Sequence, residues 1–276
     1  MVNVQLYPVE PTLTPYIRMI WSLDLSFTGE PIDLRMTADC YPHLVIRCKN
    51  AAKGLWQPEA GFVPVASLKG IATQSRMYKM STDYSHIAVS FYQNGIKNIF
   101  GIDAYETVNH LIEAEYLFPN AVIERTILAP SHRERAALLN SALIHLLCQR
   151  NHQPDKRTSD FLFNHKESYH KKLDEYNISE RQFERLFYRD VGLSPSFYKR
   201  LYRFEEILAT IRNGTLSSLT ELAYDFDYAD QAHFCREFKM FTGESASTFI
   251  RKDRVHEDNG AVERPDGIGH LIGASL

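Results

Sequence analysis

The spacing of hydrophobic residues along the chain changes from a strand-like to a helix-like period about a third of the way along. The first third contains short runs that alternate or are rich in β-branched and aromatic residues, separated by glycine and proline. Three of these runs predict strands, at Met19–Phe27, His43–Cys48 and His86–Tyr92. Several short strands with turn signals between them are typical of a β-sandwich or a small barrel.

From Asn94 onwards the hydrophobic period becomes helical. We expect a helix over Ala104–Phe118 and a stronger one over Ser131–Arg150. The next segment, Asn151–Lys156, is polar and contains a proline, so we place a linker there. The predicted division is residues 1–150 as a sensor or dimerisation domain, 151–165 as a linker, 166–254 as a helical domain and 255–276 as a flexible tail.

The helical part contains an internal repeat. Ser179–Tyr198 aligns without a gap on Asp230–Phe249, which lies 51 residues further along, with six identities in twenty positions. Two copies are too few for a solenoid, so the repeat predicts a duplicated small helical unit. The identical pairs are Phe183/Phe234, Arg185/Arg236, Phe187/Phe238, Gly192/Gly243, Ser194/Ser245 and Ser196/Ser247.

The helical phase of each copy separates two kinds of side chain. At about 100° per residue, Phe183 and Phe187 lie on one apolar face. Arg181, Arg185 and Arg189 follow a different face, where their charges repel one another unless an anion or water lies alongside. The second copy repeats the pattern with Phe234, Phe238, Phe241 and Arg236.

The spacing of the two copies distinguishes between two interpretations. One is a pair of ordinary amphipathic helices with solvated arginines. The other is a pair of helices for the DNA major groove, which is about 12 Å wide. Pro195–Arg212, between the copies, predicts a helix of about 27 Å at 1.5 Å per residue. That length suits two helices about one DNA turn, or 34 Å, apart, so duplication and spacing together favour DNA.

Specific motifs extend beyond the repeat. The chain reads ISERQFERLF over Ile178–Phe187, GLSP over Gly192–Pro195 and LAYDFDYADQAHFCREFKMFTG over Leu222–Gly243. With these motifs, the segment from Lys166 to Lys252 resembles the DNA-binding domain of the AraC/XylS family of transcription regulators. The resemblance implies an all-α domain of two helix-turn-helix units joined by a long helix.

The first half carries a weaker resemblance to the amino-terminal domain of some AraC-family regulators, which implies a cupin-like β-structure followed by helices. The predicted fold class is therefore α+β. The matching stretches are Thr14–Leu23, Asp39–Cys48, Ser90–Asp103 and the helix after Arg133.

Ser179 is a suitable N-cap for the first repeated helix, with Gln182 three residues later in the capping-box position. Both also lie at the end of the helix that enters the groove, so we count Ser179 and Gln182 among the candidate DNA contacts. Matched to the family pattern, Arg181 and Arg185 occupy base-contacting positions, and we expect Arg189 to contact phosphate. In the second copy Gln231, Ala232 and Arg236 match the positions that face the groove, and His233 lies within reach of phosphate. This copy departs from the family at Asp227, where glycine is usual, and at Ala246, where proline is usual.

Charge adds a qualification to the DNA interpretation. The chain has a formal net charge of −3, and residues 160–255 hold 15 Lys and Arg against 16 Asp and Glu. Any affinity for DNA must then come from local basic surfaces rather than from overall charge. The balanced charge and the acidic second copy motivate an alternative, a protein-interaction module derived from a regulator and with weak or no DNA binding.

Other chemistry finds little support. The four cysteines have no zinc spacing and are expected to be free thiols, and no catalytic motif is present. His43 near Asp39 and Cys40 offers a metal site only on weak grounds, and Arg76–Lys79 (RMYK) is either part of a sensor pocket or a solvated strand. We predict no metal and no cofactor, and we keep an enzyme with a cupin-like metal site as a third alternative. Neither a signal peptide nor an apolar run of membrane-spanning length is found.

Together these observations predict a cytoplasmic, sequence-specific transcription regulator rather than an enzyme. Its implied partners are double-stranded DNA, RNA polymerase, an unidentified small-molecule effector at the amino-terminal domain, and a second copy of the chain in a homodimer. The resemblance alone favours activation over repression.

Overall fold

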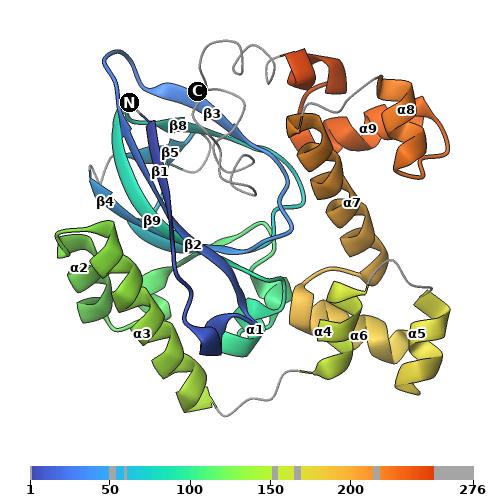
Figure 1. Cartoon of the computed structure of the whole chain (residues 1–276), viewed down its shortest axis with the longest axis horizontal. Coiled ribbons are helices and arrows are strands. Elements are labelled where there is room, and N and C mark those ends of the chain that lie inside the picture. The colour runs from blue at the N-terminus through green and yellow to red at the C-terminus, as the bar shows by residue number, and fades with distance from the viewer. Residues whose placement is uncertain are drawn as a thin grey trace.

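The computed structural model describes residues 2–49, 54–58, 61–150, 155–164, 169–213 and 218–251. An antiparallel β-domain with three flanking α-helices forms the amino-terminal half, and a set of α-helices forms the other half (Figure 1). The predicted α+β class is therefore confirmed. The tail predicted over residues 255–276 lies outside the described residues, and so does most of the polar segment at the start of the predicted linker.

Two antiparallel sheets form the amino-terminal domain. One has six strands in the order β1-β2-β9-β4-β7-β10, and the other has four in the order β3-β8-β5-β6. The three strands predicted from the sequence correspond to β2, β4 and β9, which lie next to one another at the centre of the larger sheet. The strands are β1 Val2–Tyr7, β2 Ile17–Ser26, β3 Ile32–Met36, β4 His43–Lys49, β5 Leu55–Gln57, β6 Gly61–Phe62, β7 Ala66–Lys69, β8 Arg76–Met80, β9 Asp83–Phe91 and β10 Leu111–Glu113.

The two faces of the larger sheet have different partners, because successive residues of a strand point to opposite sides. On β4, Leu44 and Ile46 belong to a core shared with the helices α1 (Gly95–Phe100), α2 (Asn120–Leu128) and α3 (His132–Arg150). The alternate residues His43, Val45 and Arg47 face the smaller sheet and line a cavity between the two sheets. Both faces of β4 are therefore buried.

The helix predicted over Ala104–Phe118 is wrong. The segment instead forms a 3-10 turn, η2 (Ala104–Glu106), strand β10 and a second 3-10 turn, η3 (Ala114–Tyr116). Asn109 has a φ of 61°, which an α-helix does not accept, and its side chain makes two hydrogen bonds to Thr73. β10 then pairs with β7, so tertiary pairing overrides the local helical pattern.

The carboxy-terminal domain contains the long helix predicted between the repeats, α7, and the two helices that carry the repeat, α6 and α9. Within the predicted linker range lies a further helix, α4, whose Phe161 and Leu162 are buried in the core of the carboxy-terminal domain. Among the described residues no helix is both long and apolar enough to cross a membrane. The helices are α4 Lys156–Phe163, α5 Tyr169–Tyr176, α6 Glu180–Val191, α7 Pro195–Arg212, α8 Leu219–Asp225 and α9 Gln231–Thr242.

Candidate nucleic-acid interface

Helices α5 and α6 form the first repeated unit, called unit one below. The predicted capping box is present at the start of α6, where Ser179 accepts a hydrogen bond from the Gln182 amide and the Gln182 side chain accepts one from the Ser179 amide. Gly192 ends the helix with a φ of 87°, as its sequence position predicts. Both ends of α6 are thus fixed by local sequence.

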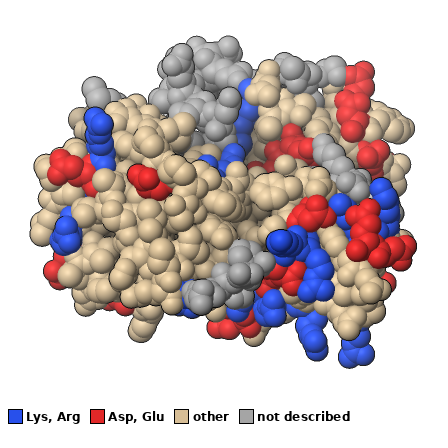
Figure 2. All heavy atoms as spheres, turned by 60° about the horizontal axis from the view of Figure 1, so that its bottom comes forward, with Lys and Arg blue, Asp and Glu red and all other residues tan. Residues whose placement is uncertain are grey.

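The two faces of α6 are divided as the helical phase predicts. Phe183 and Phe187 are fully buried and pack against Phe161 of α4 at ring-centroid distances of 5.2 Å each. Arg181 and Arg185 are exposed, and neither forms an ion pair with another described residue. Figure 2 shows Lys and Arg side chains gathered over part of the helical half, at the lower right, with acidic side chains between them. The positive charge is therefore local.

Two other predicted DNA contacts on α6 already have partners. The carbonyl oxygen of Gln182 accepts hydrogen bonds from the amide and the hydroxyl of Ser179, so only its NH2 group is left for a ligand. Arg189 is exposed, but its Nε lies 2.9 Å from the carboxylate of Asp190, which also accepts a hydrogen bond from Thr158. Gln182 and Arg189 are thus less available than Arg181 and Arg185.

Helices α8 and α9 form the second repeated unit, called unit two. Asp230 caps α9 by accepting a hydrogen bond of 2.6 Å from the His233 amide, and Gly243 ends the helix with a φ of 77°. Asp227, in the turn before α9, has a φ of 54°, so the aspartate does adopt the left-handed conformation for which glycine is usual. The three phenylalanines Phe234, Phe238 and Phe241 are buried, as predicted.

The predicted contact residues of unit two form a smaller basic surface. Gln231, Ala232 and Arg236 are exposed, whereas His233 is half-buried with its ring against Tyr228. The Gln231 side chain accepts a hydrogen bond from Thr220. Only Arg236 offers a positive charge on this part of the helix.

Sequence reasoning missed a buried ionic network between α7 and unit two. The side chain of Glu237 is 2 % exposed and lies 2.6 Å from Arg200 and 3.1 Å from Arg203. Tyr228 donates a third hydrogen bond to the same carboxylate, at 2.7 Å. Burial alone raises the pKa of Glu237, but the hydrogen bonds from Tyr228 and the two arginines outweigh it and lower the pKa. Arg200 and Arg203 precede Glu237 by 37 and 34 residues, so the sequence gave no local signal for this network.

Comparison with known families agrees with this geometry. Residues 173–252 match a family of helix-turn-helix domains. The carboxy-terminal domain is an AraC-type helix-turn-helix domain. Residues 5–113 match a family described only as a domain of unknown function. A search of curated proteins found no significant match.

Solved structures of ToxT from Vibrio cholerae are similar over most of both chains. One covers 91 % of this chain and 98 % of that one at 10 % identity, with a TM-score of 0.44. Another, of ToxT with a bound unsaturated fatty acid, covers 90 % and 94 % at 11 % identity, with a TM-score of 0.43. At these scores the likeness defines no ligand and no detailed geometry for this chain.

The amino-terminal domain contacts the AraC-type domain at the carboxyl ends of both α6 and α9. At the end of α6, Tyr188 stacks on Tyr105 with ring centroids 5.2 Å apart and an interplanar angle of 3°. Gly192 lies so close to Ala104 and Val108 that a Cβ there would meet their atoms at 2.9 and 2.6 Å.

At the end of α9, the amide of Ala38 donates a hydrogen bond of 2.8 Å to the carbonyl of Phe241. Arg35 lies 3.5 Å from the carbonyl of Gly243, the residue equivalent to Gly192 in the repeat. Equivalent ends of the two repeated helices are therefore held by one domain. In Figure 1, α7 runs between these two attachment points.

A buried polar cluster lies between the attachment points. A carboxylate oxygen of Asp39, the sulfur of Cys40 and a carboxylate oxygen of Glu205, which belongs to α7, all lie within 4.8 Å of one another. The Cys40 amide donates to Glu205 at 3.3 Å, and Gln93 donates to the Cys40 sulfur at 3.4 Å. Burial raises the pKa of the Cys40 thiol well above its usual value, so the thiol stays protonated. This cluster joins the amino-terminal domain to α7.

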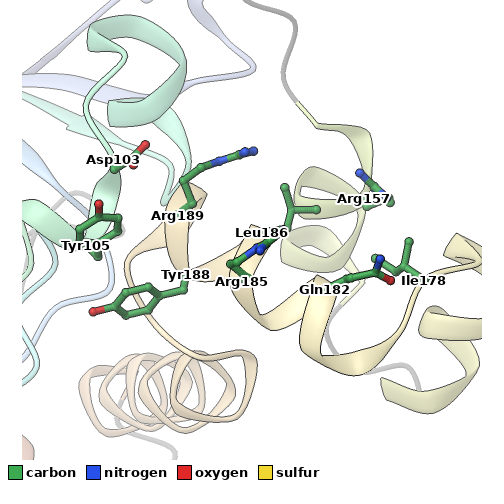
Figure 3. Close-up of a pocket in the computed structure, with 9 residues that line it drawn as sticks. All are labelled: Asp103, Tyr105, Arg157, Ile178, Gln182, Arg185, Leu186, Tyr188 and Arg189. Carbon is green, nitrogen blue, oxygen red and sulfur yellow. The ribbon is translucent and has the colours of Figure 1, made fainter.

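A groove of about 570 Å³ runs between α6 and the amino-terminal domain (Figure 3). Gln182, Arg185 and Tyr188 line this groove and also an adjoining one of about 720 Å³. The carboxyl half of α6 is thus bordered by the amino-terminal domain on one side, while its amino-terminal half stays open.

Proposed function

We propose that this protein is a sequence-specific transcription regulator whose AraC-type domain reads DNA mainly through α6. One observation carries the proposal: Arg185 and Arg236, at equivalent positions of two repeated helices, are exposed at opposite ends of an 18-residue helix and form no ion pair with the described residues. This arrangement suits two successive segments of the major groove. The proposal assigns the protein no catalytic activity.

In unit one we assign base contacts to Arg181 and Arg185. Both lie in the amino-terminal half of α6, the part of a recognition helix that enters the groove. A guanidinium group without a carboxylate partner can bind guanine O6 and N7 with two hydrogen bonds. Ser179 and the NH2 group of Gln182 contact the DNA backbone or a hydrogen-bond acceptor on a base. Arg189 reaches a phosphate only if it gives up its ion pair with Asp190.

In unit two we assign contacts to the DNA backbone rather than strong reading of bases. We assign Arg236 to a phosphate, while Gln231, Ala232 and His233 position the helix. Asp225, Asp227 and Asp230 precede or cap the amino-terminal end of α9 and oppose close approach of phosphate.

We further propose that residues 1–150 act as an effector domain, followed by a short connection and the DNA-binding domain that ends near residue 254. A ligand shifts DNA affinity only through a difference in its affinity for two domain arrangements. The contacts at the ends of α6 and α9 are the surfaces that would differ between these two domain arrangements. On resemblance to the family we expect a cytoplasmic activator that contacts RNA polymerase and dimerises.

The test is selection of bound fragments from the source genome by the purified protein, repeated with Arg185→Ala. Two boxes about one helical turn apart, with one base preference relaxed in the variant, would support the proposal. Affinity for the selected site should also fall steeply as salt rises. No enrichment with or without candidate effectors, or a flat salt response, would instead favour the protein-interaction module.

A further inference from the structure

One guanidinium group of α7 contacts both the turn of unit two and its second helix, α9. The Cζ atom of Arg203 lies 3.9 Å from the centre of the Tyr228 ring, which belongs to the turn. One terminal nitrogen lies 3.4 Å from the carbonyl oxygens of both Phe226 and Asp227, and the other donates to Glu237 of α9 at 3.1 Å. The Arg203 side chain is 24 % exposed, so these partners enclose most of it.

The apolar contacts between α7 and α9 hold the two helices together without closely specifying the rotation of α9. Phe204 of α7 packs on Phe238 and Phe241 with ring centroids 5.6 and 4.9 Å apart. Such contacts are non-directional, because their stabilisation depends on the area removed from water. Hydrogen bonds to a planar guanidinium depend strongly on direction. The rotation of α9 is therefore determined mainly by its polar contact with α7, at Glu237.

The rotation of α9 decides where its exposed basic side chain points. Arg236 directly precedes Glu237, and neighbouring residues of an α-helix lie about 100° apart around its axis. Glu237 is held against α7 and is 2 % exposed, so Arg236 is directed outwards and is exposed. A rotation at Glu237 would move the Arg236 guanidinium sideways, because its long side chain places that group far from the helix axis.

We propose that Arg203 is a positioning residue, which fixes the rotation of α9 and thereby the direction in which Arg236 meets the DNA backbone. The consequence for DNA rests on the proposed function, whereas the effect on the rotation of α9 does not. Unit one is joined to its preceding helix by other residues. Asp160 of α4 accepts hydrogen bonds from Lys172 and Tyr176 of α5, at 2.9 and 2.5 Å. A change at Arg203 should therefore act on unit two alone.

Arg200 provides the matched control for Arg203. It belongs to the same helix, and its Nε lies 2.6 Å from the same carboxylate of Glu237. It is 43 % exposed, and its guanidinium lies over Phe197 of α7 itself rather than over a residue of unit two. Arg200→Lys and Arg203→Lys both keep the positive charge. Only Arg203→Lys loses the stacking on the turn and the planar fork that reaches both the turn and α9.

The experiment measures the distance between two nitroxide labels on the full chain by pulsed electron paramagnetic resonance, without DNA. The labels are attached at Asp174→Cys on α5 and Lys239→Cys on α9, both at exposed positions. The three cysteines that are not fully buried are replaced by serine. We expect one narrow distance distribution in the labelled parent and in Arg200→Lys, and a distribution at least about twice as wide in Arg203→Lys.

A second variant covers the case that Arg203→Lys does not fold. Glu237→Gln removes the charge that Arg203 binds on α9 and leaves the contacts with the turn in place, so the distribution should widen to a lesser extent. A parent-like width in Arg203→Lys or in Glu237→Gln would overturn the inference. Equal widening in Arg200→Lys and Arg203→Lys would also overturn it, because the geometry of Arg203 would then have no special effect.

Titration with DNA gives the functional readout. The selected site is lengthened or shortened by one or two base pairs between its two boxes. The parent and Arg200→Lys should prefer one spacing by about tenfold, whereas Arg203→Lys should bind all spacings within about threefold, with unchanged affinity for the first box alone. A parent-like spacing preference in Arg203→Lys would contradict the positioning role. If the parent binds no DNA, the regulator is refuted, and the label distances still decide whether Arg203 positions α9.

Discussion

The two repeated units have the same core and different surfaces. In both, buried phenylalanines hold the recognition helix and a left-handed glycine ends it. Among the described residues, unit one presents two exposed arginines without ion pairs, at positions 181 and 185, whereas unit two presents one, Arg236. The residue equivalent to Leu186 of unit one is Glu237, which binds two arginines of α7.

This difference shows how a duplicated fold can divide its tasks. The phenylalanine and glycine positions determine the helix and its orientation, so they are the same in both copies. The remaining positions are free to differ, and in unit two the basic side chains of α7 stabilise the protein internally. We therefore expect unit one to supply sequence specificity and unit two to supply anchorage.

The largest expected effect tests what the units share. Phe187→Ala and its equivalent Phe238→Ala should each lower the free energy of unfolding by about 3–5 kcal/mol, because both rings are fully buried. Urea unfolding followed by circular dichroism measures this loss. The exposed Tyr224→Ala serves as the control. A parent-like midpoint for either phenylalanine variant would mean that the two cores are not equivalent.

The next effect distinguishes the units. Glu237→Gln should destabilise the protein by about 2 kcal/mol, because Arg200 and Arg203 lose the charge of their buried acceptor. Leu186→Gln, at the equivalent half-buried position of unit one, breaks no ion pair and should cost less.

Glu237 also predicts a pH dependence of the protein's stability. Its folded-state pKa is depressed below the usual value of 4.5, so its stabilisation is fully present above that pH and is lost as the pH falls through the folded-state pKa. Unfolding measured between pH 7 and pH 3 should thus show a smaller acid destabilisation in Glu237→Gln than in the parent. Identical pH profiles would rule out this contribution.

A smaller effect concerns DNA. Arg185→Ala should lose about 1–3 kcal/mol of discrimination at one base pair. Arg236→Ala should weaken binding to all sequences alike and lower the slope of log affinity against log salt by about 1. Selection from a random DNA library and titration at several salt concentrations compare the two. If Arg236→Ala also relaxed one base preference, the division of tasks between the units would be wrong.

The smallest effect concerns the attachment of unit one. Tyr188→Ala removes the stack on Tyr105 and should weaken the contact between the domains by about 1 kcal/mol. Hydrogen exchange of the last turn of α6 and of residues 104–109 should become faster, while exchange at the end of α9 should not. Tyr116→Ala, at an exposed tyrosine, is the control. Unchanged exchange would show that the stack contributes nothing to the contact.

Local signals made much of the fold predictable from sequence. The central strands follow from alternation, and the start and end of α6 follow from Ser179, Gln182 and Gly192. Pro195 begins α7 as expected for a residue whose missing N–H is not needed in the first turn. These features depend on residues within a few positions of one another.

The features that were not predicted depend on distant parts of the chain. The Ala104–Phe118 segment has helical composition, but Asn109 and the pairing of β10 with β7 determine its structure. The β-branched run in β4 indicates a strand, yet it does not reveal that a second sheet covers His43 and Arg47. Of the RMYK stretch, Tyr78 lines the cavity, and Lys79 lies outside it, paired with Asp33.

The attachment of the amino-terminal domain near Gly192 and Gly243 also limits how the length of α7 can change. One inserted residue would turn unit two by about 100° and move it by about 1.5 Å along the helix. DNA with a different spacing between its boxes could accommodate such a change. The backbone hydrogen bond between Ala38 and Phe241 could not. A descendant of this protein that recognises a differently spaced site would need compensating changes in its amino-terminal domain.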